Sequence, residues 1–171
     1  MTNTRTLRIE EDLDEEIQRI AKKERASINQ VANRALRRYV EWDSASSTRG
    51  LVSVPSALLE KLMESKTPAE ARKLGRWAGT ELFIPNTKAQ FARVTVDTAL
   101  RNFKMLSVYG GRFGFDHSLA DGKHRILIRQ ALGPAWTSYY AGALEGVFEE
   151  FLGKKTKIRV TGDSCLCEFE G

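Results

Sequence analysis

One short strand pattern and two short helix patterns fill the first forty-three residues of the chain, and such a module cannot fold alone. Residues 4–9 read Thr-Arg-Thr-Leu-Arg-Ile, in which Leu7 and Ile9 share one face of a half-buried strand. No second strand pattern lies in the module, and one strand with two short helices cannot bury enough apolar surface. A second copy of the chain would supply the missing strand and the missing apolar surface. The two strands can pair antiparallel about a twofold axis, and the four helices can close the core. The sequence therefore predicts an obligate, intertwined dimer.

The two helix patterns have clear starts. Six carboxylates fall within residues 10–16, where the dipole at the first turns of a helix favours negative charge. Ser27 is a favourable N-cap for the second helix, which is expected to end near residues 42–43. Both helices carry an apolar stripe with helical spacing. The stripe residues are Leu13, Ile17, Ile20 and Ala21 in the first helix, and Ile28, Val31, Ala32, Ala35, Leu36, Tyr39 and Val40 in the second.

The order of strand, acidic helix start and capped second helix resembles the ribbon-helix-helix transcription factors of the Arc, MetJ and CopG type. The resemblance covers about residues 3–42 and includes Ser-Ile-Asn-Gln at 27–30 and Ala-Leu-Arg-Arg-Tyr at 35–39. In that family the paired strands enter the major groove of DNA, and their outward side chains contact base edges. The resemblance implies a sequence-specific DNA-binding transcriptional regulator whose partner is a double-stranded DNA operator.

The outward positions of this strand are Thr4, Thr6 and Arg8. Their chemistry suits base contacts, since arginine can pair with guanine through two hydrogen bonds and threonine offers a hydroxyl and a methyl group to thymine. The family also binds a DNA phosphate at the N-terminus of its second helix, where free N–H groups point outward. The resemblance thus implies phosphate contacts from Arg5, Ser27, Ile28 and Asn29.

The turn between the two helices departs from the family. Many members place glycine there, whereas this chain has Glu24-Arg25-Ala26. An alternative is therefore a helical hairpin that serves only dimerisation, as in an antitoxin or another protein-interaction module. In that case the alternation in the strand would have no purpose.

Residues 44–50 are small and polar, as in a hinge between domains, and a second domain is expected over residues 51–171. Helix starts are expected near Pro55 and at Thr67, and a further helix is expected over residues 96–108. Paired glycines spaced four residues apart indicate close helix packing. These pairs are Gly75 with Gly79 and Gly142 with Gly146.

Two hairpins bracket one more helix in this domain. Asp121-Gly122 and Gly162-Asp163 are two-residue turn signals, and a helix is expected to start at Pro134 between the hairpins. The first turn pairs Leu119 with His124, and the second pairs Val160 with Cys165. The order of helices followed by ββαββ predicts an α+β domain built on an antiparallel sheet.

Residues 124–127, 132–136 and 162–165 carry a second resemblance. They read His-Arg-Ile-Leu, Leu-Gly-Pro-Ala-Trp and Gly-Asp-Ser-Cys, and they are similar to the vinyl-reductase-like small-molecule-binding domains, including those of archaeal regulators. This resemblance covers about residues 95–170 and implies a domain that senses a small effector or mediates assembly. The alternative for each aromatic residue is simple membership of the core. The candidate pocket residues are Phe113, Phe115, His117, Trp136, Tyr139 and Tyr140.

A metal-responsive repressor is a further alternative. His117, His124, Cys165 and Cys167 are all the histidines and cysteines of the chain, and the predicted registers point them to the same side. Residues two apart on a strand lie ~6.6 Å apart, which is wide for holding one ion. Cysteine is also often buried for packing alone. We therefore expect buried core here, and neither a metal nor a cofactor.

Composition limits the remaining function classes. The net charge is +5, and residues 1–43 are formally neutral, so the whole surplus lies in the rest of the chain, where it can add salt-sensitive affinity for nucleic acid. No nucleophile–base pattern suggests an enzyme. No apolar run approaches the ~18 residues of a membrane span, and the polar start is no signal peptide. Two cysteines fit a reducing cytoplasm. Whether dimers stack into tetramers stays open.

Overall fold

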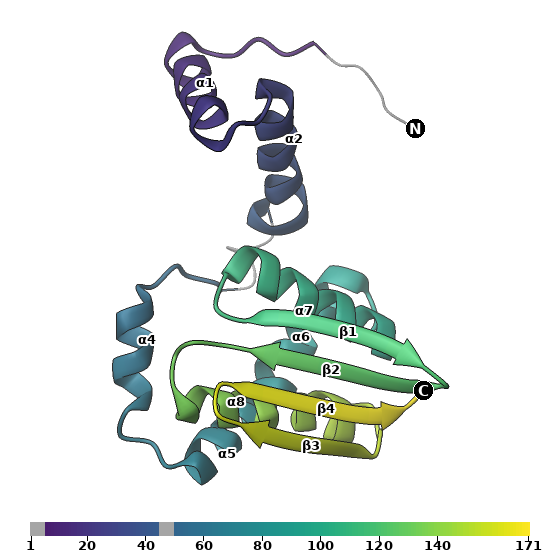
Figure 1. Cartoon of the computed structure of the whole chain (residues 1–171). Helices are drawn as coiled ribbons and strands as arrows, with labels where there is room; N and C mark the ends of the chain where they lie inside the picture. The colour runs from purple at the N-terminus through teal and green to yellow at the C-terminus, as the bar shows by residue number, and fades with distance from the viewer. Residues whose placement is uncertain (1–5, 45–49) are drawn as a thin grey trace. The chain divides into compact units, whose positions relative to one another are not determined.

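The computed structural model describes residues 6–44 and 50–171, and the chain divides into two units, Met1–Thr48 and Arg49–Gly171. The boundary between the units falls within the segment predicted as a linker. We refer to them as the N-terminal unit and the C-terminal unit. The elements of the N-terminal unit are the helices Glu11–Glu24 (α1) and Ile28–Arg38 (α2), followed by the π-helical turn Tyr39–Asp43 (η1) (Figure 1).

The local sequence explains how α2 starts and how α1 ends. The Ser27 hydroxyl accepts a hydrogen bond from the Gln30 N–H at 3.2 Å, and Gln30 Oε1 accepts one from the Ser27 N–H at 2.8 Å. Helix α1 ends at Arg25, which has φ +53° in the left-handed region that favours glycine. The turn between α1 and α2 therefore forms without glycine, with Arg25 in the left-handed conformation.

The segment before α1 has no regular secondary structure in the single chain. Residues 6–10 are exposed and make no strand ladder with other described residues. A strand needs hydrogen bonds to a second strand, which one copy of the N-terminal unit does not supply. The strand predicted over residues 4–9 therefore stays a prediction, and its first members, Thr4 and Arg5, lie outside the described residues.

The C-terminal unit has an α+β fold with an antiparallel sheet, as predicted. The strand order is β1-β2-β4-β3. The α-helices are Ser56–Met63 (α4), Pro68–Ala78 (α5), Ile84–Phe91 (α6), Val96–Gly110 (α7) and Pro134–Glu145 (α8). The π-helical turns are Gly79–Phe83 (η2) and Gly146–Phe151 (η3), and the strands are Gly114–Ala120 (β1), Lys123–Arg129 (β2), Thr156–Thr161 (β3) and Ser164–Glu170 (β4).

The two hairpin registers are confirmed. Leu119 faces His124 across β1 and β2, and Val160 faces Cys165 across β3 and β4. The resulting inner face of the sheet packs on α7 and α8, while the helices leave the outer face uncovered (Figure 1). The core between the layers includes stacked rings, with Phe148 and Phe169 centroids 4.7 Å apart.

Helix α6 was not predicted. The helix starting at Thr67 was expected to run towards Phe83, and it does so through α5 and η2, but the chain continues in helical form to Phe91. Pro85 directly follows the π-helical turn η2, and the chain stays helical through it. Of the helices that the structure describes, none combines the length and apolar character needed to cross a membrane.

Candidate functional site

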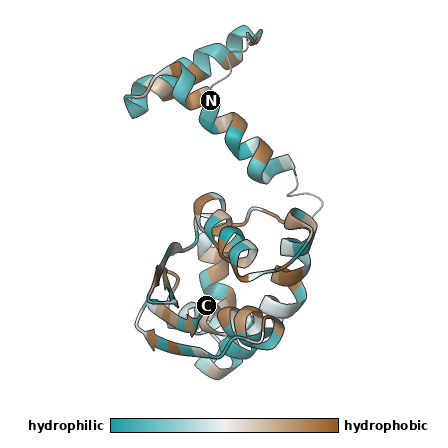
Figure 2. Ribbon diagram, turned by 90° about the vertical axis from the view of Figure 1, so that its right-hand side faces the viewer, coloured by the Kyte–Doolittle hydropathy of each residue, from teal (hydrophilic) through white to brown (hydrophobic). Residues whose placement is uncertain are grey.

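The apolar stripes of α1 and α2 are only partly covered within one chain. Ala21 and Val31 are buried where the two helices meet. Most other stripe residues are exposed, and Figure 2 shows hydrophobic residues interspersed with hydrophilic ones along the two helices. Leu36 is 50% exposed and Val40 is 71% exposed. Leu7 and Ile9 of the preceding segment are also exposed, so the N-terminal unit presents apolar surface that a single copy leaves in water.

The described DNA-contact candidates lie at the surface of the N-terminal unit. Thr6 and Arg8 are exposed in the segment before α1, and Arg8 makes no ion pair with the described residues. Ser27 engages its hydroxyl and its N–H in the capping box. The N–H groups of Ile28 and Asn29, in the first turn of α2, have no acceptor within the helix. These two amides therefore remain able to donate to an anion.

A cavity of about 200 Å³ lies in the C-terminal unit beside the aromatic residues of α8. Of the six pocket candidates, Phe113, Tyr139 and Tyr140 line it. Most of the other lining residues come from α5, η2, α6 and α7, where no pocket residue was predicted. The full lining is Leu51, Ala78, Leu82, Phe83, Asn86, Phe103, Leu106, Phe113, Tyr139, Tyr140 and Ala143.

The other three pocket candidates have different positions. Phe115 is buried in the core beneath β1, with its ring centroid 6.0 Å from that of Phe103. Trp136 packs beside Tyr139 and donates a hydrogen bond from Nε1 to the Leu59 carbonyl oxygen at 3.1 Å, which ties α4 to α8. His117 is exposed in the middle of the edge strand β1. None of the three is among the residues that line this cavity, and their place in an effector pocket stays a prediction.

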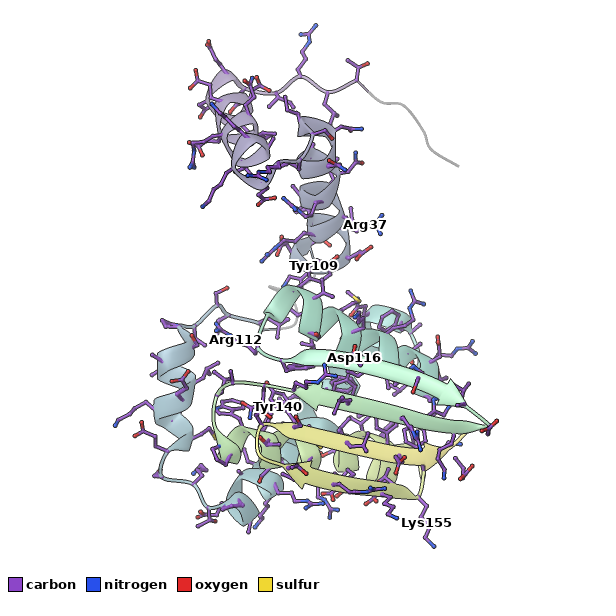
Figure 3. All side chains as sticks on the ribbon, viewed as in Figure 1. Arg37, Tyr109, Arg112, Asp116, Tyr140 and Lys155 are labelled. Atoms are coloured by element: carbon purple, nitrogen blue, oxygen red, sulfur yellow. The ribbon has the colours of Figure 1, made fainter. Side chains whose placement is uncertain are left out.

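Polar groups reach the cavity from two sides. Burial raises the pKa of Tyr139, and it raises that of Tyr140 further, with the nearby Arg112 charge opposing the shift. Figure 3 labels Tyr140 on α8 and Arg112 ahead of β1. Among the described residues, neither tyrosine hydroxyl has a hydrogen-bond partner, and the side-chain amide of Asn86 has none either. The cavity therefore combines aromatic walls with three polar groups that a bound molecule could satisfy.

The four metal candidates fall into two separate pairs. His117 Nε2 and His124 Nδ1 are 2.9 Å apart, and the His124 ring stacks on Phe169. Cys165 and Cys167 are fully buried in the core. Ile126 on β2 lies between His117 on β1 and Cys167 on β4, which separates the imidazoles from the thiols.

Burial in the core keeps the two thiols protonated. Burial raises the pKa of Cys165 to about 12, and it raises the pKa of Cys167 as well. Metals bind the thiolate form. Within residues 6–44 and 50–171, no group of three or more histidine, cysteine or acidic side chains could hold a metal ion.

Sequence reasoning missed a basic groove on the outer face of the sheet. Strand alternation would have found it, because side chains two apart on β2 and β3 project from the same face. The groove has a volume of about 330 Å³. It is lined by Lys123, Arg125, Lys155, Lys157, Arg159, Glu168, Phe169 and Glu170.

Neither a scan against protein-family models nor a search of curated proteins found a match to this chain.

Proposed function

We propose that the chain is a dimeric, sequence-specific DNA-binding transcriptional regulator whose C-terminal unit binds a small effector. The observation that carries this proposal is the pair of open apolar stripes on α1 and α2, next to an exposed segment that bears Thr6 and Arg8. A ribbon-helix-helix dimer would use both features at once. It would cover the stripes and pair the segments into a two-stranded ribbon.

Burial energetics support the dimer. Complete burial of a leucine, isoleucine or valine side chain contributes about 1.5–3 kcal/mol relative to leaving it exposed. Leu13, Leu36 and Val40 are each at least half exposed in one copy. Covering these and the other stripe residues would supply several kcal/mol, which is comparable with the whole stability of a small domain.

The chemistry of the described residues supports DNA as the partner. In a paired ribbon, Thr6 and Arg8 would occupy outward positions that reach base edges in the major groove. The free amides of Ile28 and Asn29, at the positive end of the α2 dipole, would hold a backbone phosphate. Phosphate contacts set the position of the protein, and the ribbon side chains select the sequence.

The cavity of the C-terminal unit supports an effector role. Apolar cavities of about 150 Å³ are large enough to bind benzene, and this cavity holds about 200 Å³. Its aromatic walls and the hydroxyl groups of Tyr139 and Tyr140 suit a single-ring compound with one polar substituent. Trp77 and Leu82 are about half exposed, so assembly of dimers is a second role for this unit.

Two alternatives have less support. The partner-binding segments of antitoxins are usually short and disordered alone, whereas the C-terminal unit has its own core between helices and sheet. A metal-responsive repressor would need the thiols and imidazoles to meet, and Ile126 separates them.

Selection of duplexes from a random library tests the DNA-binding role. The wild type should enrich a common sequence with two related half-sites, as a twofold-symmetric dimer requires. Arg8→Ala should weaken binding to that sequence by about 1–3 kcal/mol and relax the preference at one position in each half-site. Arg19→Ala, which removes an exposed arginine of α1, is the matched control. Unchanged affinity and preference in Arg8→Ala would contradict the base-contacting role.

Thermal unfolding with p-cresol tests the cavity. This phenol offers one ring and one hydroxyl group, so it should raise the melting temperature of the wild type in proportion to its binding. Leu106→Trp should remove the shift, because the larger side chain fills the cavity. Val108→Trp, at an exposed position of the same helix, should keep it. Equal shifts in both variants would place the binding site elsewhere.

A further inference from the structure

The outer face of the C-terminal sheet is open and carries paired rows of cations. Lys123 and Arg125 project from β2, while Lys157 and Arg159 project from β3, and β4 runs between them. Lys155 precedes β3, and Figure 3 shows its side chain pointing away from the sheet. The groove holds five cationic side chains and only two carboxylates, Glu168 and Glu170.

Glu168 organises the two arginines without neutralising them both. Its oxygens accept hydrogen bonds from Arg125 Nε at 2.8 Å and from an Arg159 terminal nitrogen at 3.0 Å. The Glu168 side chain is 10% exposed, whereas those of Arg125 and Arg159 are 60% and 59% exposed. One enclosed carboxylate thus fixes two guanidinium groups whose remaining N–H donors face solvent.

The charge state of Glu168 is secured by these neighbours. Partial burial would raise the pKa of Glu168, but the Arg125 hydrogen bond and the charges of Arg125, Arg159 and Lys123 together lower it. The carboxylate therefore stays ionised at neutral pH. The two arginines are therefore held in place at neutral pH, where the phosphates of DNA are charged.

The lysines of the groove are available to a ligand. Lys155 and Lys157 form no ion pair with any carboxylate in residues 6–44 and 50–171. Lys123 lies 3.7 Å from Glu170, a loose contact between exposed groups. Exposed pairs of this kind contribute little and exchange readily for a better anion.

We propose that this groove binds the phosphate backbone of double-stranded DNA, as a sequence-independent contact additional to the N-terminal unit. The choice of DNA as the anion rests on the proposed function. The geometry favours an extended polyanion, because cation rows on β2 and β3 lie two strand spacings apart, about 10 Å. The Glu168 carboxylate already holds one arginine of each row, so the lysines and the remaining N–H donors on either side of it can each contact a separate phosphate of a duplex.

The salt dependence of binding to a random-sequence duplex tests the inference, with fluorescence anisotropy on the full chain. Each lysine–phosphate contact contributes about 0.9 to the slope of log affinity against log salt concentration. Lys155→Gln/Lys157→Gln should therefore make the slope less steep by about 2 between about 50 and 200 mM salt. Lys73→Gln/Lys88→Gln removes the same charge from exposed positions of α5 and α6 and should leave the slope unchanged.

Equal slopes in the two double variants would overturn the inference. So would a wild type that ignores the random duplex and binds vesicles containing phosphatidylserine through the same lysines. The experiment distinguishes failure of the groove proposal from failure of the proposed regulatory function. A selected operator that still depends on Arg8, with no slope change in Lys155→Gln/Lys157→Gln, would contradict only the groove. A slope change without any sequence preference would contradict only the regulator.

Discussion

Gly142 of α8 lies directly against the backbone of Arg72 in α5, so that a Cβ atom on Gly142 would stand 2.0 Å from the Arg72 carbonyl oxygen. The contact is reciprocal, since a Cβ atom on Gly75 would stand 1.9 Å from the Tyr139 carbonyl oxygen. Glycines four residues apart on both helices let the two backbones meet. This contact positions Tyr139 and Tyr140 at the cavity.

Gly142→Ala should destabilise the C-terminal unit strongly. The methyl group would collide with backbone that cannot rotate away, and overpacking of this kind costs about 1–3 kcal/mol or more. Gly110→Ala is the control, because a Cβ atom there meets nothing within 4 Å and helical alanine is favoured over glycine by about 0.5–1 kcal/mol. Chemical denaturation measures both. Similar stabilities for the two variants would refute the close backbone contact.

The paired glycines and the two-residue turns made part of this unit predictable. Gly142-x3-Gly146 indicated close helix packing, and Asp121-Gly122 fixed the register of β1 on β2, because a one-residue slip would turn every side chain to the other face. Both features are local in sequence, so a single segment carries enough information to specify them.

The cavity could not be predicted in the same way. Its lining joins Leu51, Asn86 and Leu106 to the aromatic residues of α8, and no periodicity links positions so far apart in the chain. The aromatic pattern located Tyr139 and Tyr140, but it could not separate them from Phe115, which has the same composition signal and lies in the core. Whether an aromatic side chain is buried in the core or lines a cavity depends on how the helices pack against one another, and the pattern of one segment does not contain that information.

Arg25→Gly should stabilise the N-terminal unit. Arg25 has φ +53°, and a left-handed conformation costs a residue with a Cβ atom about 1–2 kcal/mol, a cost that glycine avoids. The gain is reduced because glycine has more freedom in the unfolded chain. We expect a net increase of about 0.5–1 kcal/mol in the free energy of unfolding. Arg25→Val should lower the same quantity, and a stabilising effect of valine would contradict the conformation of this turn.

Acidification should destabilise the C-terminal unit through the His117–His124 pair. Burial lowers the pKa of both imidazoles from the ordinary value of 6.5, helped by the His124 charge at His117 and by Lys154 at His124. The folded state therefore keeps them neutral at a pH where the unfolded chain takes up protons. Stability should be constant above about pH 6.5 and fall as the pH drops below it.

Thermal melting of wild type and His117→Gln/His124→Gln between about pH 5 and 7.5 separates this effect from that of the carboxylates, which titrate lower. The double variant should lose much of the decrease in melting temperature across this range. An equally large decrease in the variant would show that other groups cause the acid sensitivity.

Leu36→Glu should abolish dimerisation. Leu36 lies on the α2 stripe and is 50% exposed in one copy, so a carboxylate there costs a single chain little. In a dimer that covers the stripe, the same carboxylate would be buried without a partner, which costs several kcal/mol. Analytical ultracentrifugation should show monomers, and binding to the selected duplex should be lost because the proposed two-stranded ribbon needs both copies. Asn33→Glu places the same charge on the polar face of the same helix and should remain dimeric. A dimeric Leu36→Glu protein would mean that copies meet through another surface and that the α2 stripe has a different partner.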